Sequence, residues 1–501
     1  MPSFRWLSLS LFVLLNTCTF SATGYSAPLQ RNQTVANRQS SIVTNGGFTE
    51  WDDDQPTGWS VADGAGDGSA PFSTVAKGSG GGLELSGNTK TRTWKSMSQA
   101  VSTAPETTYE LNLTTKTQGI NQEPGQFNNC YVGVVSKNAK GATVLQSLLN
   151  VATIEWSTQT LYFRVPESAT KTEVRIFLSK TGTLSIKHIE VIPSTKNSFD
   201  ILVDDMSRHY SYFQHKNIDW TSLTTSYREK AQTTDGGKFT SVVTEMLSQL
   251  KDSHVWIIHD GKHVSTFQKK PNLNLNFNYV SSKLKDKKQV RGCCVTGKTP
   301  EGFGYILIES MSRIDGRKFR QITTDLRRLF DCPGLIVDVR VNGGGNEIIG
   351  QKLAGMFCQR EHVYAVRKSR SGKAHTDFTP SRESVLRPWR LNEGDKAYTA
   401  PIICLQGEGA ISSGEGFTLM MKAIPHCTNI GQPTRGASGN PMPIKLPNGV
   451  DVFYSRWVAM DAKGQTIEDI GVPPDVAIEH LPDGDSTFDT AIKMLNDRTK
   501  K

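Results

Sequence analysis

The sequence predicts two folded regions of different class, an all-β sandwich followed by an α/β domain with a largely parallel sheet. Three observations support this division. Residues 41–195 hold short alternating strands between turns rich in Gly, Asn, Asp and Pro, without helical periodicity. Beyond residue 199 the pattern changes to amphipathic helices and continuous apolar strands. These strands run into glycine- or serine-rich loops and further helices, which is typical of a parallel sheet.

Composition and charge exclude several classes of protein. Of the 501 residues, 37% are hydrophobic and 21% are charged, which is enough apolar material for several cores and excludes a mostly disordered chain. The net charge of +9 is spread along the chain without a run of five Lys or Arg, so no nucleic-acid partner is predicted. Beyond the N-terminus no stretch of 18 apolar residues occurs, so no stable membrane span is expected.

The N-terminus has the layout of a secretory signal peptide at 1–27. Arg5 precedes an apolar run of ten residues from Trp6 to Leu15, and small residues follow up to Ala27. An uncleaved anchor is the alternative, but the run is too short to span a bilayer. Cys18 faintly suggests a lipidation site. We therefore expect an exported protein, periplasmic or extracellular, that loses this segment.

A polar linker at 28–40 leads into the predicted β-sandwich at 41–195. Its clearest strands are predicted at 108–113, 131–135, 160–165 and 173–178. The opening Asn45-Gly-Gly-Phe48 and Pro56-Thr-Gly-Trp59 resembles the first strands of jelly-roll carbohydrate-binding modules. That resemblance implies a jelly-roll-like sandwich and a possible glycan partner.

Two features of this opening admit alternative interpretations. Trp51 and Trp59 could stack on sugar rings, although an aromatic residue in such a strand more often belongs to the core. Asp52, Asp54 and Asp63 offer hard oxygen ligands for calcium, although acidic loop residues are usually only solvated. No CxxC or HExxH spacing occurs, so no other metal and no cofactor is expected.

The second region is predicted to begin with a helical part at 199–260 and to continue as an α/β core at 261–497. Apolar residues at 239, 242, 243, 246, 247 and 250 predict one face of a helix. A second amphipathic helix is predicted at about 317–330 and a third at about 414–424. Buried strands are predicted at 334–340 and 401–406.

Three short segments carry residues suited to chemistry. Ser412 lies on a strand-to-helix turn, where backbone N–H groups and the helix dipole favour negative charge, but a serine there is often only an N-cap. The turn Gly343-Gly344-Gly345 permits a close backbone approach to a ligand, or is simply a tight turn. His254 follows Ser253 at the end of a helix, where it is either a packed ring or a general base.

Together, four segments resemble the C-terminal processing and tricorn-like serine peptidase family. The segments are 334–345 (Gly-Leu-Ile-Val-Asp-Val-Arg-Val-Asn-Gly-Gly-Gly), 250–255 (Leu-Lys-Asp-Ser-His-Val), 401–415 with 431–436, and 467–475 (Ile-Glu-Asp-Ile-Gly-Val-Pro-Pro-Asp). They occur in the family's order over roughly 199–497. The resemblance implies an α/β peptidase domain with a spiral-type sheet of the ClpP/crotonase kind, acting on peptides or proteins without a cofactor.

Departures from the family pattern indicate its tricorn-core branch. The processing branch uses a Ser–Lys dyad with the lysine 25 residues after the nucleophile, and that position is Ala437 here. Lys422 and Lys445 do not fit the register. Too few residues separate His254 from the strand at 304–308 for the PDZ insert of many relatives. We therefore expect the Ser–His arrangement of the tricorn-like branch.

The resemblance assigns a role to each candidate residue. The nucleophile is Ser412, the base is His254, and Glu468 orients the histidine through the helper Ser253. The oxyanion hole would be the N–H of Ser413 with that of Gly344 or Gly345, and Gly343 and Arg435 would bind substrate, Arg435 through a carboxylate. Asp338 and Arg340 are expected to form a structural ion pair under the glycine turn.

These assignments predict an exported serine endopeptidase. Two other functions stay open at this point. The same scaffold can carry a non-catalytic pocket, since the interphotoreceptor retinoid-binding protein belongs to this family. The same triad would also serve an esterase or sugar deacylase that a glycan-binding sandwich directs to its substrate.

Overall fold

The computed structural model describes residues 40–65, 75–78, 81–88, 93–120, 130–151, 155–179, 181–233, 235–312, 314–372, 374–481 and 483–500. The predicted signal peptide at 1–27, and the predicted linker at 28–40 apart from its last residue, lie outside these ranges. Within them, no helix is long and apolar enough to cross a membrane.

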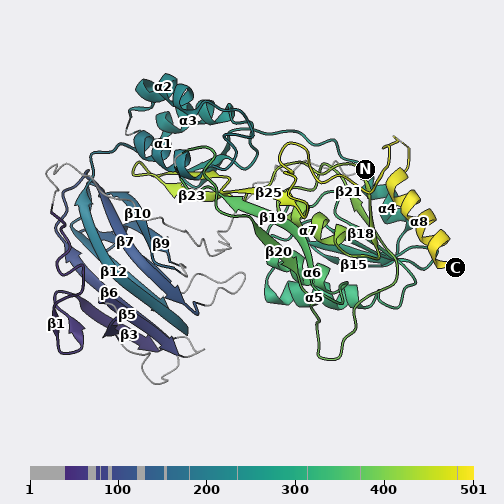
Figure 1. Cartoon of the computed structure of the whole chain (residues 1–501), viewed down its shortest axis with the longest axis horizontal. Coiled ribbons are helices and arrows are strands. Elements are labelled where there is room, and N and C mark those ends of the chain that lie inside the picture. Colours follow the sequence, from purple (N-terminus) through teal and green to yellow (C-terminus); the bar gives the residue numbers. More distant parts are fainter. Residues whose placement is uncertain are drawn as a thin grey trace.

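The N-terminal region is a sandwich of two five-stranded antiparallel sheets (Figure 1). The first sheet has the order β3 (Ser60–Ala65), β6 (Thr93–Val101), β11 (Lys171–Ser179), β8 (Cys130–Lys137), β9 (Thr143–Asn150). The second has the order β10 (Ser157–Arg164), β7 (Thr108–Gln118), β12 (Thr181–Pro193), β5 (Leu83–Asn88), β4 (Val75–Lys77). A small hairpin of β1 (Trp51–Asp52) and β2 (Gln55–Pro56) lies beside them.

The side chains that point inward from these strands form the core of the sandwich. Buried and partly exposed residues alternate through β7, where Leu111 and Leu113 are completely buried. Ile176 and Leu178 of β11, in the other sheet, belong to the same apolar cluster. The four strands predicted from sequence are confirmed as parts of β7, β8, β10 and β11, although the observed strands extend up to five residues beyond the predicted ends and β10 stops one residue before its predicted end.

Trp51 and Trp59 occupy different environments. Trp59 is 2% exposed and packs on Phe48 with ring centroids 5.3 Å apart, so its place in the core is confirmed. Trp51 is half-buried, donates from Nε1 to the Phe48 carbonyl at 2.6 Å, and has the Lys77 ammonium 5.7 Å from its ring centroid. Trp59 is therefore not accessible for stacking on a sugar.

The aspartates considered for calcium are near this hairpin. Asp52 and Asp54 are exposed, and the side chain of Asp63 is outside the described part of the chain. Among the described residues, no group of three or more His, Cys, Asp or Glu side chains is arranged to hold a metal ion.

Three helices connect the sandwich to the second region. They are α1 (Ser198–His209), α2 (Trp220–Ala231) and α3 (Gly236–Ser248). Each begins at a polar N-cap whose side chain accepts a backbone N–H, namely Asn197, Asp219 and Asp235. Their apolar faces share one core with a four-stranded sheet of order β14 (Lys262–Ser265), β13 (Trp256–His259), β24 (Val450–Tyr454), β23 (Met442–Lys445). The helix predicted at 239–250 is confirmed as α3.

A seven-stranded sheet forms the centre of the α/β region (Figure 1). Its order is β15 (Lys285–Val290), β16 (Cys294–Lys298), β17 (Gly304–Ile308), β18 (Leu335–Asp338), β21 (Ile402–Gln406), β22 (Cys427–Gly431), β26 (Val476–Ala477). The strands from β17 to β26 are parallel, and β15 and β16 are antiparallel. The prediction of a largely parallel sheet is confirmed.

Helices cover both faces of this sheet. The even-numbered residues of β17 belong to a core that includes side chains of α5 (Gly316–Arg327), α6 (Glu347–Gly355) and α7 (Ser413–Lys422). The odd-numbered residues belong to a second core with α4 (Phe277–Lys283) and α8 (Ser486–Thr499). A sheet buried on both faces explains why its central strands β17, β18 and β21 are largely apolar and completely buried. A three-stranded sheet of β20 (Arg382–Leu386), β19 (His362–Ser369) and β25 (Trp457–Asp461) lies beside it.

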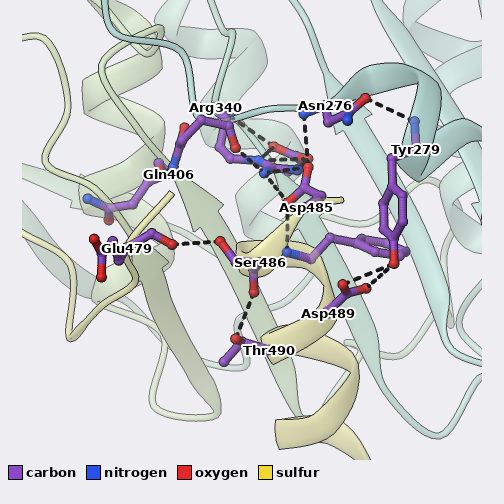
Figure 2. Close-up of polar contacts among 12 residues, drawn as sticks. Asn276, Tyr279, Arg340, Gln406, Glu479, Asp485, Ser486, Asp489 and Thr490 are labelled. Carbon is purple, nitrogen blue, oxygen red and sulfur yellow. Dashed lines mark hydrogen bonds and ion pairs between the residues drawn. The ribbon is translucent and has the colours of Figure 1, made fainter. Parts of the chain in front are cut away.

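A buried ionic network lies where β18 ends, just before the glycine turn (Figure 2). Arg340 is completely buried and pairs with Asp338 at 2.6 Å and with Asp485 at 2.7 Å. Asp485 also caps α8 and accepts the Asn276 N–H at 3.0 Å. The predicted pair of Asp338 and Arg340 is therefore confirmed, and Asp485 is a third member that fastens the last helix behind the glycine turn.

Candidate active site

Ser412 occupies the turn between the buried strand β21 and the helix α7. Its φ is 59° and its ψ is −128°, a combination that costs a non-glycine residue on the order of 1–3 kcal/mol. The backbone is held by hydrogen bonds from the Ser412 N–H to the Ala437 carbonyl (3.0 Å) and from the Glu415 N–H to the Ser412 carbonyl (2.8 Å). Ser412 stands at the N-cap position, but its side chain makes no capping hydrogen bond. The hydroxyl is therefore available for chemistry.

The glycine turn packs directly against Ser412. Gly344 has φ of +82°, and a Cβ atom added there would lie 2.9 Å from both the Ile411 carbonyl oxygen and the Ser412 Cβ. The same position would be 3.2 Å from the Ser413 nitrogen. The Ser413 hydroxyl donates to the Gly345 carbonyl at 2.7 Å and ties the two turns together. The fold thus brings the predicted nucleophile and the predicted oxyanion turn into contact.

The backbone N–H groups of this turn have different partners. Gly343 donates to the Glu309 carbonyl at 3.1 Å, and Gly344 donates to Asn342 Oδ1 at 2.9 Å. Among the described residues, the N–H groups of Gly345 and Ser413 have no hydrogen-bond partner. Since Gly344 is already engaged, Gly345 and Ser413 are the two donors left for a developing negative charge.

We expect Gly344→Ala to lower kcat/KM for peptide cleavage about 100-fold, since small displacements at a reacting centre have effects of that size. The physical reason is the positive φ together with the clash of the new methyl group with Ser412. Gly394→Ala is the matched control, because its φ of +83° is nearly the same but its added Cβ meets nothing within 4 Å. Cleavage kinetics and thermal melting of both variants make the test. Equal kinetics for Gly344→Ala and wild type would contradict this placement of the turn.

His254 lies in the turn that follows α3 and is 5% exposed. Burial lowers the pKa of its imidazole below 6.5, with Asp252 opposing the shift and Arg435 adding to it. At neutral pH the ring is therefore in the uncharged form that a general base requires. Its Nδ1 atom is buried without a hydrogen-bond partner among the described residues. No hydrogen bond joins the ring to Ser412, a contact that in ligand-free enzymes often forms only around substrate.

Glu468 has a different partner from the one predicted. Its carboxylate is 1% exposed and pairs with Lys216 at 3.0 Å, while Oε2 accepts the Ser438 N–H at 3.2 Å. Ser253 is half-buried and forms no hydrogen bond with Glu468 or His254. The relay through the helper serine is therefore not formed in this structure, because the buried carboxylate is satisfied by the nearest buried ammonium group.

A second acid interacts with both Glu468 and the histidine. Asp252 is completely buried and accepts the His254 N–H at 2.7 Å through Oδ1. Its Oδ2 accepts hydrogen bonds from the Tyr210 hydroxyl and the Ser455 hydroxyl, both at 3.0 Å. Burial raises the pKa of Glu468 well above its usual range, with Asp252 adding to the shift and Lys216 opposing it. The two acids therefore form one electrostatic unit behind His254.

Arg435, predicted to bind a substrate carboxylate, lies two residues before Ala437. Its guanidinium donates to the Glu408 carbonyl at 2.7 Å and to the Lys269 carbonyl at 3.1 Å. Burial lowers its pKa, and the described residues hold no carboxylate that forms an ion pair with it. The Arg435 guanidinium could therefore still pair with a carboxylate next to the site.

The structure also explains why a Ser–Lys dyad does not form. Ala437, at the register position of that lysine, is 4% exposed and packs beside Ser412. The Lys422 ammonium instead pairs with Asp475. The sequence did not predict three buried charged side chains of the site, namely Lys216, Asp252 and Glu415. Of these, only Asp252 belongs to a motif that the sequence presents, beside Ser253 and His254.

Comparison with known proteins identifies peptidases. Residues 302–478 match the model of peptidase family S41, a range that includes Ser412 and Glu468 but not His254. A tricorn protease from Thermoplasma volcanium is 31% identical over 210 residues, which are 40% of this chain and 18% of that protein. This chain therefore spans less than a fifth of that relative's length.

One solved structure shows the same fold. A putative peptidase from Parabacteroides merdae superposes with a TM-score of 0.52 at 24% identity, covering 60% of this chain and 96% of that one. A photosystem II D1 C-terminal processing protease aligns with a TM-score of 0.38 at 15% identity, over 56% of this chain and 92% of that one. The resemblance to tricorn-like peptidases of family S41 that the short motifs predict is confirmed.

Proposed function

We propose that this chain, whose residues 302–478 match peptidase family S41, is a serine endopeptidase with Ser412 as its nucleophile. One observation carries the proposal. Ser412 has a strained backbone and an unused hydroxyl, and it lies against a turn where the N–H groups of Gly345 and Ser413 have no partner among the described residues. A site that leaves a hydroxyl and two backbone donors unpaired at one point is suited to acyl transfer.

The proposed reaction follows from these positions. His254 removes the proton from the Ser412 hydroxyl as its oxygen attacks the carbonyl carbon of a peptide bond. The N–H groups of Ser413 and Gly345 hold the oxyanion of the tetrahedral intermediate, and each such donor is typically worth ~2.7–4 kcal/mol of barrier. The imidazolium then gives its proton to the leaving amine. A water molecule, deprotonated by the same histidine, releases the acyl group.

The buried acids would stabilise the imidazolium during this step. Asp252 raises the pKa of His254 against the effect of burial, and it fixes the backbone of the histidine. The ion pair with Lys216 favours the ionised form of Glu468 against the effect of burial, and in that form Glu468 would add negative charge. The helper role of Ser253 requires its hydroxyl to rotate between His254 and Glu468 when substrate is bound.

The substrate side of the proposal depends on Arg435. Its guanidinium is anchored by two carbonyl groups next to the segment that holds Ser412, and it has no carboxylate partner among the described residues. A substrate with a carboxylate near the scissile bond would supply that partner. Gly343 would line the same part of the cleft.

Export and glycan binding complete the proposal. The basic and apolar layout of residues 1–27 supports export to the periplasm or the outside of the cell. The sandwich supports an accessory module, for which a glycan is one candidate ligand. A binding assay on an array of polysaccharides would test the second point without depending on peptidase activity.

A non-catalytic ligand-binding protein is the second candidate. It is favoured by the lack of a hydrogen bond between His254 and Ser412. Digestion of a diverse peptide library, read by mass spectrometry, decides between the two functions. A peptidase produces new termini with a defined sequence preference. A folded protein that produces none at any pH between 5 and 9 would refute the peptidase and favour the binding protein.

A further inference from the structure

Glu415 is a completely buried carboxylate that the proposed reaction does not use. It lies in the first turn of α7, three residues after the nucleophile. Its Oε1 atom accepts the Thr434 hydroxyl and the Gly436 N–H, both at 2.7 Å. Its Oε2 atom accepts the Ala437 N–H at 3.1 Å. One side chain of the nucleophile helix therefore binds three donors of a single loop.

This loop, residues 434–438, also holds Ser412. The Ala437 carbonyl accepts the Ser412 N–H at 3.0 Å, and the Ser412 carbonyl accepts the Glu415 N–H at 2.8 Å. The hydrogen bonds thus form a closed ring from Glu415 through the loop to Ser412 and back to Glu415. On its far side the loop donates the Ser438 N–H to Glu468. Displacement of the loop would move the nucleophile and Glu468 together.

We propose that Glu415 is a positioning residue whose carboxylate form holds the 434–438 loop against Ser412, so that protonation of Glu415 relaxes the loop and lowers peptidase activity. This inference rests on the proposed peptidase function and adds a means of regulating it by pH. Glu415 acts through the loop and the Ser412 backbone, and it does not touch the substrate.

Hydrogen-bond chemistry gives the physical reason. A carboxylate only accepts, so all three donors of the loop can be satisfied at once. A protonated carboxyl group carries its own O–H donor, which would compete with one of the three donors that the carboxylate accepts. An unsatisfied buried N–H is unfavourable, so the loop would shift to satisfy it elsewhere.

The surroundings of Glu415 support a change of charge near neutral pH. Burial raises its pKa to about 7, and the hydrogen bonds from Thr434, Gly436 and Ala437 oppose the shift. The charged and titratable groups that interact with it are Arg435 on the loop and Tyr212 after α1, and Glu468 lies beyond the loop. None of the described cations forms an ion pair with Glu415. His254 is distinguishable, because burial lowers its pKa below 6.5.

The first test is the pH profile of kcat/KM for a cleaved peptide, measured from pH 5 to 9. A group with a pKa of about 7 is about nine-tenths ionised at pH 8 and about one-tenth ionised at pH 6. The kcat/KM of the wild type should therefore fall about tenfold from pH 8 to pH 6. Glu415→Gln keeps the shape of the side chain but carries a permanent N–H donor. Its kcat/KM should therefore be about tenfold below that of wild type at pH 8 and should not change near pH 7. Glu361→Gln, an exposed acid paired with Arg387, should keep the wild-type profile.

The second test does not depend on activity. Protection factors of the Gly436 and Ala437 amides, corrected for intrinsic exchange, are measured by hydrogen exchange in the wild type at pH 6 and pH 8. We expect lower protection at pH 6 than at pH 8. Equal protection at both values, or a Glu415→Gln profile with the wild-type midpoint, would overturn the inference. If wild type cleaves no peptide at any pH, the proposed function fails, and hydrogen exchange still decides the role of Glu415.

Discussion

Ser412→Ala is expected to lower kcat/KM for peptide cleavage by roughly 10⁴ to 10⁶-fold, the range seen when the nucleophile of such a site is removed. The physical reason is that the attacking oxygen is lost while the rest of the site is intact. The Ser412 side chain makes no capping hydrogen bond, so the substitution removes no contact that holds the fold. Progress curves on a peptide found by library digestion, together with thermal melting, provide the measurement.

Ser413→Ala is the matched control for this prediction. Its hydroxyl donates to the Gly345 carbonyl at 2.7 Å, but its backbone N–H, the proposed oxyanion donor, is unchanged. We expect a loss of at most about tenfold, since a single supporting hydrogen bond contributes about 1 kcal/mol. If the two alanine variants lost activity equally, or if Ser412→Ala retained it, Ser412 would not be the nucleophile.

Arg340→Met is expected to destabilise the α/β region by about 3–5 kcal/mol, as breaking a buried ion pair on one side usually does. The substitution leaves the carboxylates of Asp338 and Asp485 buried without their cation, and all three side chains are completely buried. It also removes the hydrogen bond to the Asn274 carbonyl at 2.6 Å. Denaturant unfolding of the full chain, followed by hydrogen exchange in α8, measures the loss.

The control for this second prediction is Arg387→Met. Arg387 pairs with Glu361 at 2.9 Å, but both side chains are more than half exposed, so we expect a change of about 1 kcal/mol or less. A similar small change for Arg340→Met would mean that the buried network does not fasten α8 to the core. Faster exchange confined to α8 and the glycine turn would support the assignment in Figure 2.

Local pattern was enough to predict much of the fold. The helix α3 was predictable from its periodic apolar face, and the strands β18 and β21 from their continuous apolar runs. The observed ends of these elements differ from the predicted ends by a few residues. The ion pair of Asp338 and Arg340 was also predictable, because the two residues are only two positions apart where β18 ends. Asp485 was not, because 145 residues separate it from Arg340 and its segment has no motif.

The candidate site was predictable as a set of segments and not as a set of contacts. Short motifs identified Ser412, His254 and Glu468, but they could not show that Glu468 pairs with Lys216. That choice depends on which buried cation the tertiary fold brings to the acid. Similarly, Glu415 belongs to the nucleophile segment, but its role becomes visible only when the loop donors are in place. Trp59 shows the same limit in the sandwich, since only the fold decides between a buried and an exposed aromatic ring.

The central claim is that Ser412 is an activated nucleophile. Its most direct test is covalent labelling with a fluorophosphonate, read by intact mass and by peptide mapping of the labelled wild-type protein. We predict a single adduct on Ser412, absent from Ser412→Ala and formed much more slowly in His254→Ala, because the histidine must take the proton. A folded wild-type protein that gains no adduct, or gains one at a serine other than Ser412, would contradict the claim.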